Sequence, residues 1–198
     1  MNTKYCAWSA AALSLCVASS PALSGVLKNG SFEKPVVPDG SFTTFNLGDK
    51  FNGWTVVGDS GSVAVISGDF SYCVALPAKK GLQFLDLTGY SDSATGVQQK
   101  IKTQPGATYA VTFFVGNIVG GGNCGTQSTV DLVIDGTAAG SFTNKAGKGK
   151  DAIVWKKFST EFTAETDTTT IAFMNGDPAD DTANGLDGVS VKLVKDAP

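Results

Sequence analysis

The sequence contains no histidine and no arginine, so all 15 of its basic residues are lysine. Without histidine, the chain cannot form Ser–His or Cys–His nucleophile pairs or histidine-based zinc sites. Without arginine, it lacks the planar fork that binds phosphate and carboxylate groups through two parallel hydrogen bonds. The formal net charge of −3 argues against nucleic acid as a partner.

Glutamate is also scarce, which limits the carboxylate chemistry that the chain can perform. A glycoside hydrolase can work with two carboxylates and no histidine, and Asp86 is a possible partner for a glutamate. No carboxylate pair has a spacing that argues for a catalytic dyad. We therefore predict a protein that is not an enzyme, with a glycoside hydrolase as an alternative. The three glutamates are Glu33, Glu161 and Glu165.

Only one long apolar run exists, and it lies at the start of the chain. Lys4 precedes a mostly apolar stretch from Ala7 to Ala18, and Ala22-Leu23-Ser24 places small residues where signal peptidase cleaves. The run is too short to span a bilayer. We expect residues 1–24 to be a signal peptide and 25–198 to be a single domain, secreted or periplasmic, without membrane insertion after cleavage.

Two of the four cysteines, Cys6 and Cys16, leave with the predicted signal peptide. The remaining pair, Cys73 and Cys124, is expected to form a disulfide in an exported protein, with two free thiols as the alternative. Both lie in stretches rich in glycine and serine. A bridge between them would join two long loops.

Alternation of apolar and polar residues is the main structural pattern of the chain. In Ala107–Gly116, every second side chain from Tyr109 to Val115 is apolar, which is typical of a half-buried strand. Asp135-Gly136 lies between two such runs and predicts a hairpin. We find no helical period and expect about ten short strands in a β-sandwich or jelly roll. Residues 36–52 and 177–183 are expected to form loops.

Two phrases, Asn29-Gly30-Ser31-Phe32-Glu33 and Gly185-Leu186-Asp187-Gly188-Val189-Ser190-Val191, stand at opposite ends of the mature chain. Together with the motifs between them, they resemble the domain-of-unknown-function 642 (DUF642) family, over nearly all of the mature chain. The intervening motifs include Gly53-Trp54-Thr55-Val56, Phe84-Leu85-Asp86-Leu87-Thr88-Gly89, Gly96-Val97-Gln98-Gln99 and Pro105-Gly106-Ala107-Thr108-Tyr109. The resemblance implies an all-β, galactose-binding-like jelly roll that binds cell-wall or extracellular polysaccharide without catalysis.

Related jelly rolls often hold a structural calcium ion where the first and last strands meet. Glu33 and Asp187 fall within the matching motifs, and nearby turn carbonyls would complete an oxygen shell. The resemblance thus implies one structural Ca²⁺ at these two residues. The alternative is that both carboxylates accept hydrogen bonds from backbone amides or face solvent. Asp177, Asp180 and Asp181 form a second acidic stretch, which is more typical of a solvated turn.

Aromatic side chains on a polar face are the candidate sugar-binding residues, because pyranose rings stack on aromatic faces. By alternation from Phe158 and Phe162, Trp155 falls on the face away from the core, as a binding platform. A local bulge would instead return it to the core. Phe114 and Val133 also point outward, either as part of a ligand-binding face or beneath a covering loop.

Polar residues near the two loop cysteines are the second group of candidates. If the disulfide forms, Tyr72, Asn117 and Gln127, together with Asn123, would form a polar rim around a binding site. The alternative is an ordinary stapled loop. A lysine cluster could attract acidic polysaccharide, although charge runs more often only solubilise a loop. Its members are Lys145, Lys148, Lys150, Lys156 and Lys157.

We therefore expect an exported, non-catalytic carbohydrate-binding protein whose partner is a polysaccharide or other glycan. A functional class of a different kind is the alternative: an extracellular matrix or adhesion protein that binds protein partners. That alternative predicts a large apolar surface patch, which the sequence does not show.

Overall fold

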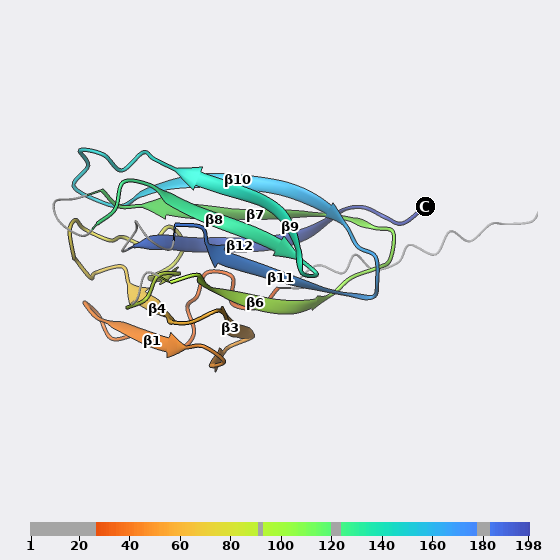
Figure 1. Cartoon of the computed structure of the whole chain (residues 1–198), viewed down its shortest axis with the longest axis horizontal. Coiled ribbons are helices and arrows are strands. Elements are labelled where there is room, and N and C mark those ends of the chain that lie inside the picture. The colour runs from red at the N-terminus through yellow and green to blue at the C-terminus, as the bar shows by residue number, and fades with distance from the viewer. Residues whose placement is uncertain (1–26, 91–92, 120–123, 178–182) are drawn as a thin grey trace, which may run out of the picture.

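The computed structural model describes residues 27–90, 93–119, 124–177 and 183–198, so the predicted signal peptide lies outside the described residues. Strands dominate the described residues, and they form two six-stranded antiparallel sheets packed face to face (Figure 1). Sheet A has the order β1-β4-β5-β12-β7-β10, and sheet B has the order β2-β3-β6-β11-β8-β9. The bounds are β1 Phe42–Asn46, β2 Lys50–Phe51, β3 Trp54–Gly58, β4 Ser62–Ser67, β5 Gln83–Asp86, β6 Thr95–Lys102, β7 Thr108–Asn117, β8 Ser128–Ile134, β9 Thr137–Asn144, β10 Val154–Thr163, β11 Thr168–Asn175 and β12 Asn184–Lys195.

The main core lies between the sheets and consists of the side chains that alternation predicts. On β7, the inward side chains of Tyr109, Val111, Phe113 and Val115 are each at most 1% exposed. Trp54 on β3 is buried between the sheets, and its ring meets Phe173 of β11 edge-on. The predicted hairpin joins β8 to β9, and Asp135 and Gly136 both have the positive φ that such turns require.

The prediction that residues 36–52 form loops is wrong in part. Strand β1 lies at one edge of sheet A, and the two-residue β2 lies at the corresponding edge of sheet B. Phe45 of β1 and Phe51 of β2 stack with ring centroids 4.4 Å apart, which joins the two edges. Both strands are short and separated by turn residues, so the alternation that marks a strand has little length in which to appear.

The two terminal phrases meet, although the first of them forms a turn rather than a strand. The Val189 backbone N–H of β12 donates to the Gly30 carbonyl at 2.8 Å, and the Trp54 indole N–H donates to the Asn29 carbonyl at 3.0 Å. Phe32 is fully buried and stacks on Trp54 with ring centroids 5.4 Å apart. The start of the described chain is therefore held against its last strand. No helix among the described residues has the length and apolar character needed to cross a membrane.

Candidate functional site

A second apolar cluster, here called the outer cluster, covers the face of sheet A that points away from sheet B. Because side chains alternate along a strand, Val63 and Val65 of β4 enter the main core while Ala64 and Ile66 point outward. The segment 68–82 between β4 and β5, here called the cysteine loop, folds over these outward side chains. The buried members of the outer cluster are Ala64, Ile66, Leu76, Phe84, Ile118, Cys124, Ile153 and Ala183.

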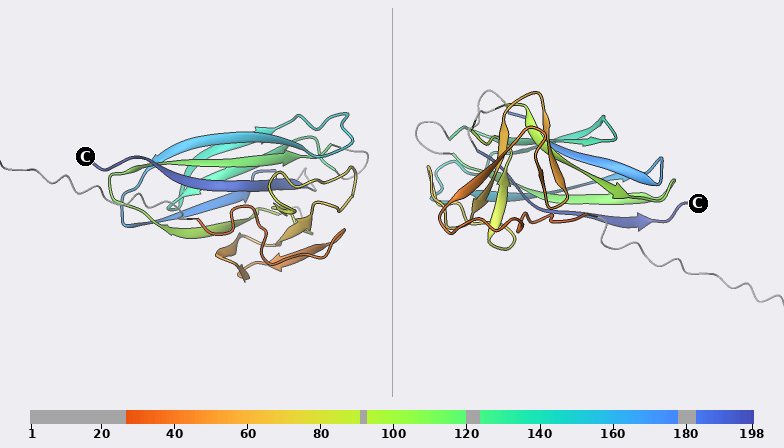
Figure 2. Two further views of the ribbon diagram at one scale, coloured as in Figure 1. Left: turned by 180° about the vertical axis from the view of Figure 1, so that it is seen from behind. Right: turned by 90° about the horizontal axis from the view of Figure 1, so that it is seen from below.

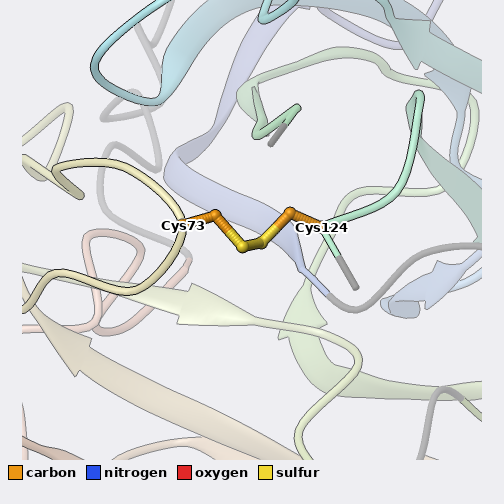
Figure 3. Close-up of a disulfide and its surroundings, with 2 residues drawn as sticks. All are labelled: Cys73 and Cys124. Atoms are coloured by element: carbon orange, nitrogen blue, oxygen red, sulfur yellow. A yellow bond between two sulfur atoms is a disulfide. The ribbon is translucent and has the colours of Figure 1, made fainter. Parts of the chain in front are cut away.

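The predicted disulfide is confirmed, and it fixes the cysteine loop to the segment that precedes β8. Cys73 and Cys124 are bonded with their Cα atoms 6.3 Å apart, and the bridge joins the two loops directly (Figure 3). The loop also pairs with the residues just before β10: the Ala75 N–H donates to the Asp151 carbonyl at 3.0 Å. The Ile153 N–H donates in turn to the Ala75 carbonyl at 2.9 Å. Covalent and backbone bonds thus hold one half of the loop.

Trp155 lies on the outer face of sheet A, as alternation predicts, but the cysteine loop reaches it. In the register of the sheet, Trp155 of β10 stands beside Gly116 of β7, followed by Gly185 of β12 and Asp86 of β5. The indole lies over the two glycines: a Cβ atom would come within 2.8 Å of the ring at Gly116 and 3.0 Å at Gly185.

The contacts of the half-buried Trp155 side chain explain its orientation. Its indole N–H donates to the Pro77 carbonyl of the cysteine loop at 2.9 Å, and its ring meets Phe84 edge-on at 5.3 Å. Neither expected environment, an open platform or the main core, describes this position. Trp155 instead joins the loop to the sheet.

Glu33 and Asp187 bind the other half of the cysteine loop. The Glu33 carboxylate accepts the N–H of Leu82 at 3.0 Å and the N–H of Gln83 at 3.1 Å. The Asp187 carboxylate, fully buried, accepts the N–H of Lys79 at 2.8 Å and the N–H of Lys80 at 2.7 Å. Figure 2 (left) shows the loop, in yellow, beside the start of β12.

Burial raises the pKa of the Asp187 carboxyl from 3.8 to about 7. The N–H groups of Lys80, Gly188 and Lys79 oppose this rise, and the negative charge of Glu33 adds to it. The group therefore changes its charge near neutral pH.

The arrangement around these two carboxylates does not fit a calcium ion well. Calcium requires six to eight oxygen ligands, whereas the groups that surround Glu33 and Asp187 are backbone N–H donors, whose positive ends repel a cation. In the part of the chain that the structure describes, no three His, Cys, Asp or Glu side chains gather at one point. Calcium binding at Glu33 and Asp187 is left to experiment, and these contacts lead us to expect no bound ion there.

Part of the outer cluster lines an aromatic pocket of about 390 Å³, within the range of small-molecule sites. Phe42 is central to its aromatic side, because its ring meets both Phe70 and Tyr90 edge-on, at 5.3 and 5.7 Å. Tyr72 and Tyr90 are 61% and 72% exposed, so their rings are accessible to a ligand. The described residues that line the pocket are Phe42, Ala64, Ile66, Phe70, Tyr72, Leu76, Asp86, Gly89, Tyr90, Ile118 and Ala183.

Asp86 is the charged residue among the described residues that line the pocket, and it is only 5% exposed. Its Oδ1 atom accepts the Thr88 N–H at 3.1 Å, the Thr88 hydroxyl at 2.7 Å and the Asn184 N–H at 3.1 Å. These bonds come from both the following turn and β12, so the carboxylate has a fixed position.

The turn after β5 places Tyr90 at the mouth of the pocket. Gly89 has a φ of +53°, and a Cβ atom there would lie 2.3 Å from the Ser62 carbonyl oxygen, so only glycine fits. The Tyr90 N–H donates to the Ser62 hydroxyl at 3.3 Å. The backbone that carries the Tyr90 ring is thereby bound to β4.

Among the three described residues that were expected to form a polar rim, Tyr72 lines the pocket, and Asn117 and Gln127 do not. Asn117 is fully buried: its amide donates to the Ser128 hydroxyl at 3.1 Å and accepts the Gly147 N–H at 2.8 Å. It therefore fixes loops rather than facing outward. Gln127 donates to the Asp177 carboxylate at 2.7 Å. Asn123, Asp180 and Asp181 lie outside the described residues.

Phe114 and Val133 do not share one outward face, because β7 belongs to sheet A and β8 to sheet B. Phe114 does lie on the outer face of sheet A, where the Lys79 ammonium of the cysteine loop stands 5.2 Å from its ring centroid. This matches the alternative that a loop covers it. The five lysines of the expected acidic-polysaccharide cluster are all exposed, and none lines the pocket.

Sequence reasoning missed Phe42, Phe70 and Tyr90 as site residues. Phe42 belongs to the unrecognised strand β1, and the other two lie in loops. One available signal was the outward position of Phe84 and Asp86 on β5, which marks an apolar, partly charged face beneath the neighbouring loops.

Two antiparallel sheets around one core, with a binding-sized pocket on the outer face of one sheet, define a jelly-roll β-sandwich with a candidate ligand site. The chain belongs to the family described as "Protein of unknown function (DUF642)", whose model matches residues 25–192. This confirms the resemblance in the sequence. No curated protein matches the chain.

Solved structures share the fold at low sequence identity. A cyclase from Fischerella sp. TAU is 19% identical with a TM-score of 0.63, over 90% of this chain and 100% of that chain. The CBM22-1–CBM22-2 tandem domain of Paenibacillus barcinonensis Xyn10C is 17% identical with a TM-score of 0.51, over 82% of this chain and 48% of that chain. The likeness therefore extends to an enzyme and to carbohydrate-binding modules.

Proposed function

We propose that the protein is an exported, non-catalytic carbohydrate-binding protein that holds a sugar residue of a glycan in the aromatic pocket. The observation that carries this proposal is the pair of exposed rings, Tyr72 and Tyr90, beside an apolar wall that contains one buried carboxylate. Sugar rings present both an apolar face and a set of hydroxyls. Aromatic rings bind the first, and a fixed hydrogen-bond acceptor such as Asp86 binds the second.

Three further observations support the binding role and the location. Asp86 is the one carboxylate in the described lining of the pocket, whereas hydrolysis of a glycosidic bond requires two that flank it. The fold is shared with a pair of CBM22 carbohydrate-binding modules, which supports sugar binding, although a cyclase shares it too. The Cys73–Cys124 disulfide fits an oxidising compartment and hence export.

The test is a glycan array together with pull-downs on insoluble polysaccharides, with the wild type and with Tyr72→Ala and Tyr90→Ala. We expect retention on at least one glycan, and each variant is expected to lose about 1 kcal/mol of binding, roughly fivefold in affinity. Leu47→Ala is the matched control, because Leu47 is an exposed apolar residue outside the pocket lining. Absence of retention on every glycan contradicts the proposal. Release of reducing ends from a bound glycan contradicts the non-catalytic role.

A further inference from the structure

The aromatic pocket has an unusual charge distribution for a protein with 15 lysines. Its described lining contains aromatic, aliphatic and glycine residues and a single charged residue, Asp86. No lysine belongs to this described lining. A ligand in the pocket therefore meets one negative charge and no positive charge from the described residues that form its wall.

The buried position of Asp86 strengthens the effect of its negative charge on a bound ligand. At 5% exposure, the carboxylate lies among apolar side chains such as Ala64 and Ile66, where water screens charges poorly. Hydrogen bonds from Thr88 and Asn184 keep it in place and stabilise its negative form. The carboxylate cannot swing into solvent without breaking bonds to two different elements.

A fixed, buried carboxylate distinguishes sugars by charge. A neutral sugar donates its hydroxyl hydrogens to such an acceptor, whereas the carboxylate of a uronic acid residue is repelled at short range. We infer that the pocket selects neutral sugar residues and excludes uronic acid residues, with Asp86 as the residue that determines this specificity. The inference rests on the proposed function, because it concerns the same pocket.

The aromatic side of the pocket adds a second requirement, which concerns the shape and polarity of the ligand. Phe42 meets the rings of Phe70 and Tyr90 edge-on, so the three rings hold one another in defined orientations. Tyr72, carried by the disulfide-bonded cysteine loop, adds the second exposed ring. A ligand needs an apolar ring face for these side chains and hydroxyls for Asp86, which a neutral pyranose provides.

The experiment compares three probes that differ mainly in charge: the methyl glycosides of galactose, of galacturonic acid and of the methyl ester of galacturonic acid. The corresponding glucose series is measured in parallel, because the sugar configuration is a separate property. Affinities come from calorimetry or ligand-observed NMR. We expect the free uronate to bind roughly tenfold more weakly, or worse, than both its ester and the neutral parent. The difference is expected to persist in high salt, which screens the general negative charge of the protein but not a buried carboxylate.

The matched variants are Asp86→Asn and Glu161→Gln, each of which removes one negative charge from the outer face of sheet A. Asn keeps an acceptor oxygen for the Thr88 and Asn184 amides, and we expect it to reduce the preference for ester over free uronate to less than about threefold. Glu161 is exposed on β10 and outside the pocket lining, so its variant is expected to keep the wild-type ratio.

The outcomes separate the inference from the proposed function. Equal or tighter binding of the free uronate by the wild type overturns the inference while glycan binding stands. An unchanged ester-to-uronate ratio in a folded Asp86→Asn overturns the role of Asp86. If that variant does not fold, the wild-type ratios at low and high salt still decide whether uronates are excluded. Absence of binding by any sugar or glycan overturns both.

Discussion

Glu33 and Asp187 bind neighbouring backbone amides of one loop, and the charge of Glu33 adds to the burial that raises the pKa of Asp187 to about 7. The two residues come from the first turn and the last strand of the described chain. The cysteine loop is therefore hydrogen-bonded to both ends of the described chain.

The stability of the protein is expected to fall as the pH rises from about 4 to about 7. In this range, the folded state binds a proton at Asp187 that the unfolded state has already released, because the pKa is about 7 in the folded state and near 3.8 otherwise. Extra proton binding by the folded state makes the free energy of unfolding decrease with rising pH. Asp187→Asn is expected to show a flatter dependence of melting temperature on pH, measured between pH 4.5 and 8.5. Parallel curves for the two proteins would contradict this assignment.

Replacing Glu33 by Ala is expected to destabilise the fold by roughly 1–3 kcal/mol, because the N–H groups of Leu82 and Gln83 lose their charged acceptor. Glu33→Gln keeps one acceptor oxygen and is expected to lose less. Chemical denaturation measures both values. Glu161→Ala removes an exposed carboxylate from β10, away from the cysteine loop, and is the control, expected to change stability by less than about 0.5 kcal/mol. A similar loss in all three variants would refute the specific role of Glu33.

Calcium removal tests the ion that related jelly rolls led us to expect. With N–H donors already bound to Glu33 and Asp187, a chelator is expected to leave the melting temperature unchanged. The measurement compares protein dialysed against a chelator with protein in millimolar calcium chloride. A rise of several degrees with calcium, abolished in Asp187→Asn, would instead establish the ion at this junction.

Loss of the disulfide is expected to destabilise the protein by roughly 4 kcal/mol in the chain-entropy model, given its sequence separation of 51 residues. The variant with both Cys73 and Cys124 replaced by Ser is compared with the oxidised wild type in denaturant. Glycan affinity is expected to fall as well, because the same loop carries Tyr72. An affinity equal to that of the wild type would show that the remaining anchors suffice to place Tyr72.

A methyl group at Gly116 is expected to destabilise the protein by about 1–3 kcal/mol through overpacking. It would lie 2.5 Å from Ile153 and 2.8 Å from the Trp155 ring, whereas at Gly185 the nearest ring atom is 3.0 Å away. Gly185→Ala is therefore expected to have the smaller effect. In a double-mutant cycle, Trp155→Ala should reduce the penalty of Gly116→Ala. Strictly additive effects would show that the indole does not press on Gly116.

The sequence was sufficient for those parts of the fold that depend on one strand at a time. Alternation assigned Tyr109 and Phe113 to the core, placed Trp155 on the opposite face, and located the hairpin at Asp135-Gly136. Each of these follows from the two-residue period of a strand or from the φ angles of a turn.

The pocket could not be predicted in this way, because its rings come from three separated segments. Phe42 belongs to an edge strand, Tyr72 to the cysteine loop and Tyr90 to the turn after β5. Their meeting depends on the order of strands in sheet A and on long-range bonds to the loop, neither of which has a local pattern. For the same reason, the loop that covers Trp155 was not foreseen.

The outer cluster lies on the far side of sheet A from the main core, so the two apolar regions do not share side chains. The part of the cysteine loop outside the disulfide is therefore expected to open locally, with its own free energy, while the sandwich remains folded. Its backbone amides are expected to exchange with deuterium earlier than those of β7. In evolutionary terms, such a loop can change its rings and its ligand preference while the sandwich that supports it keeps its stability.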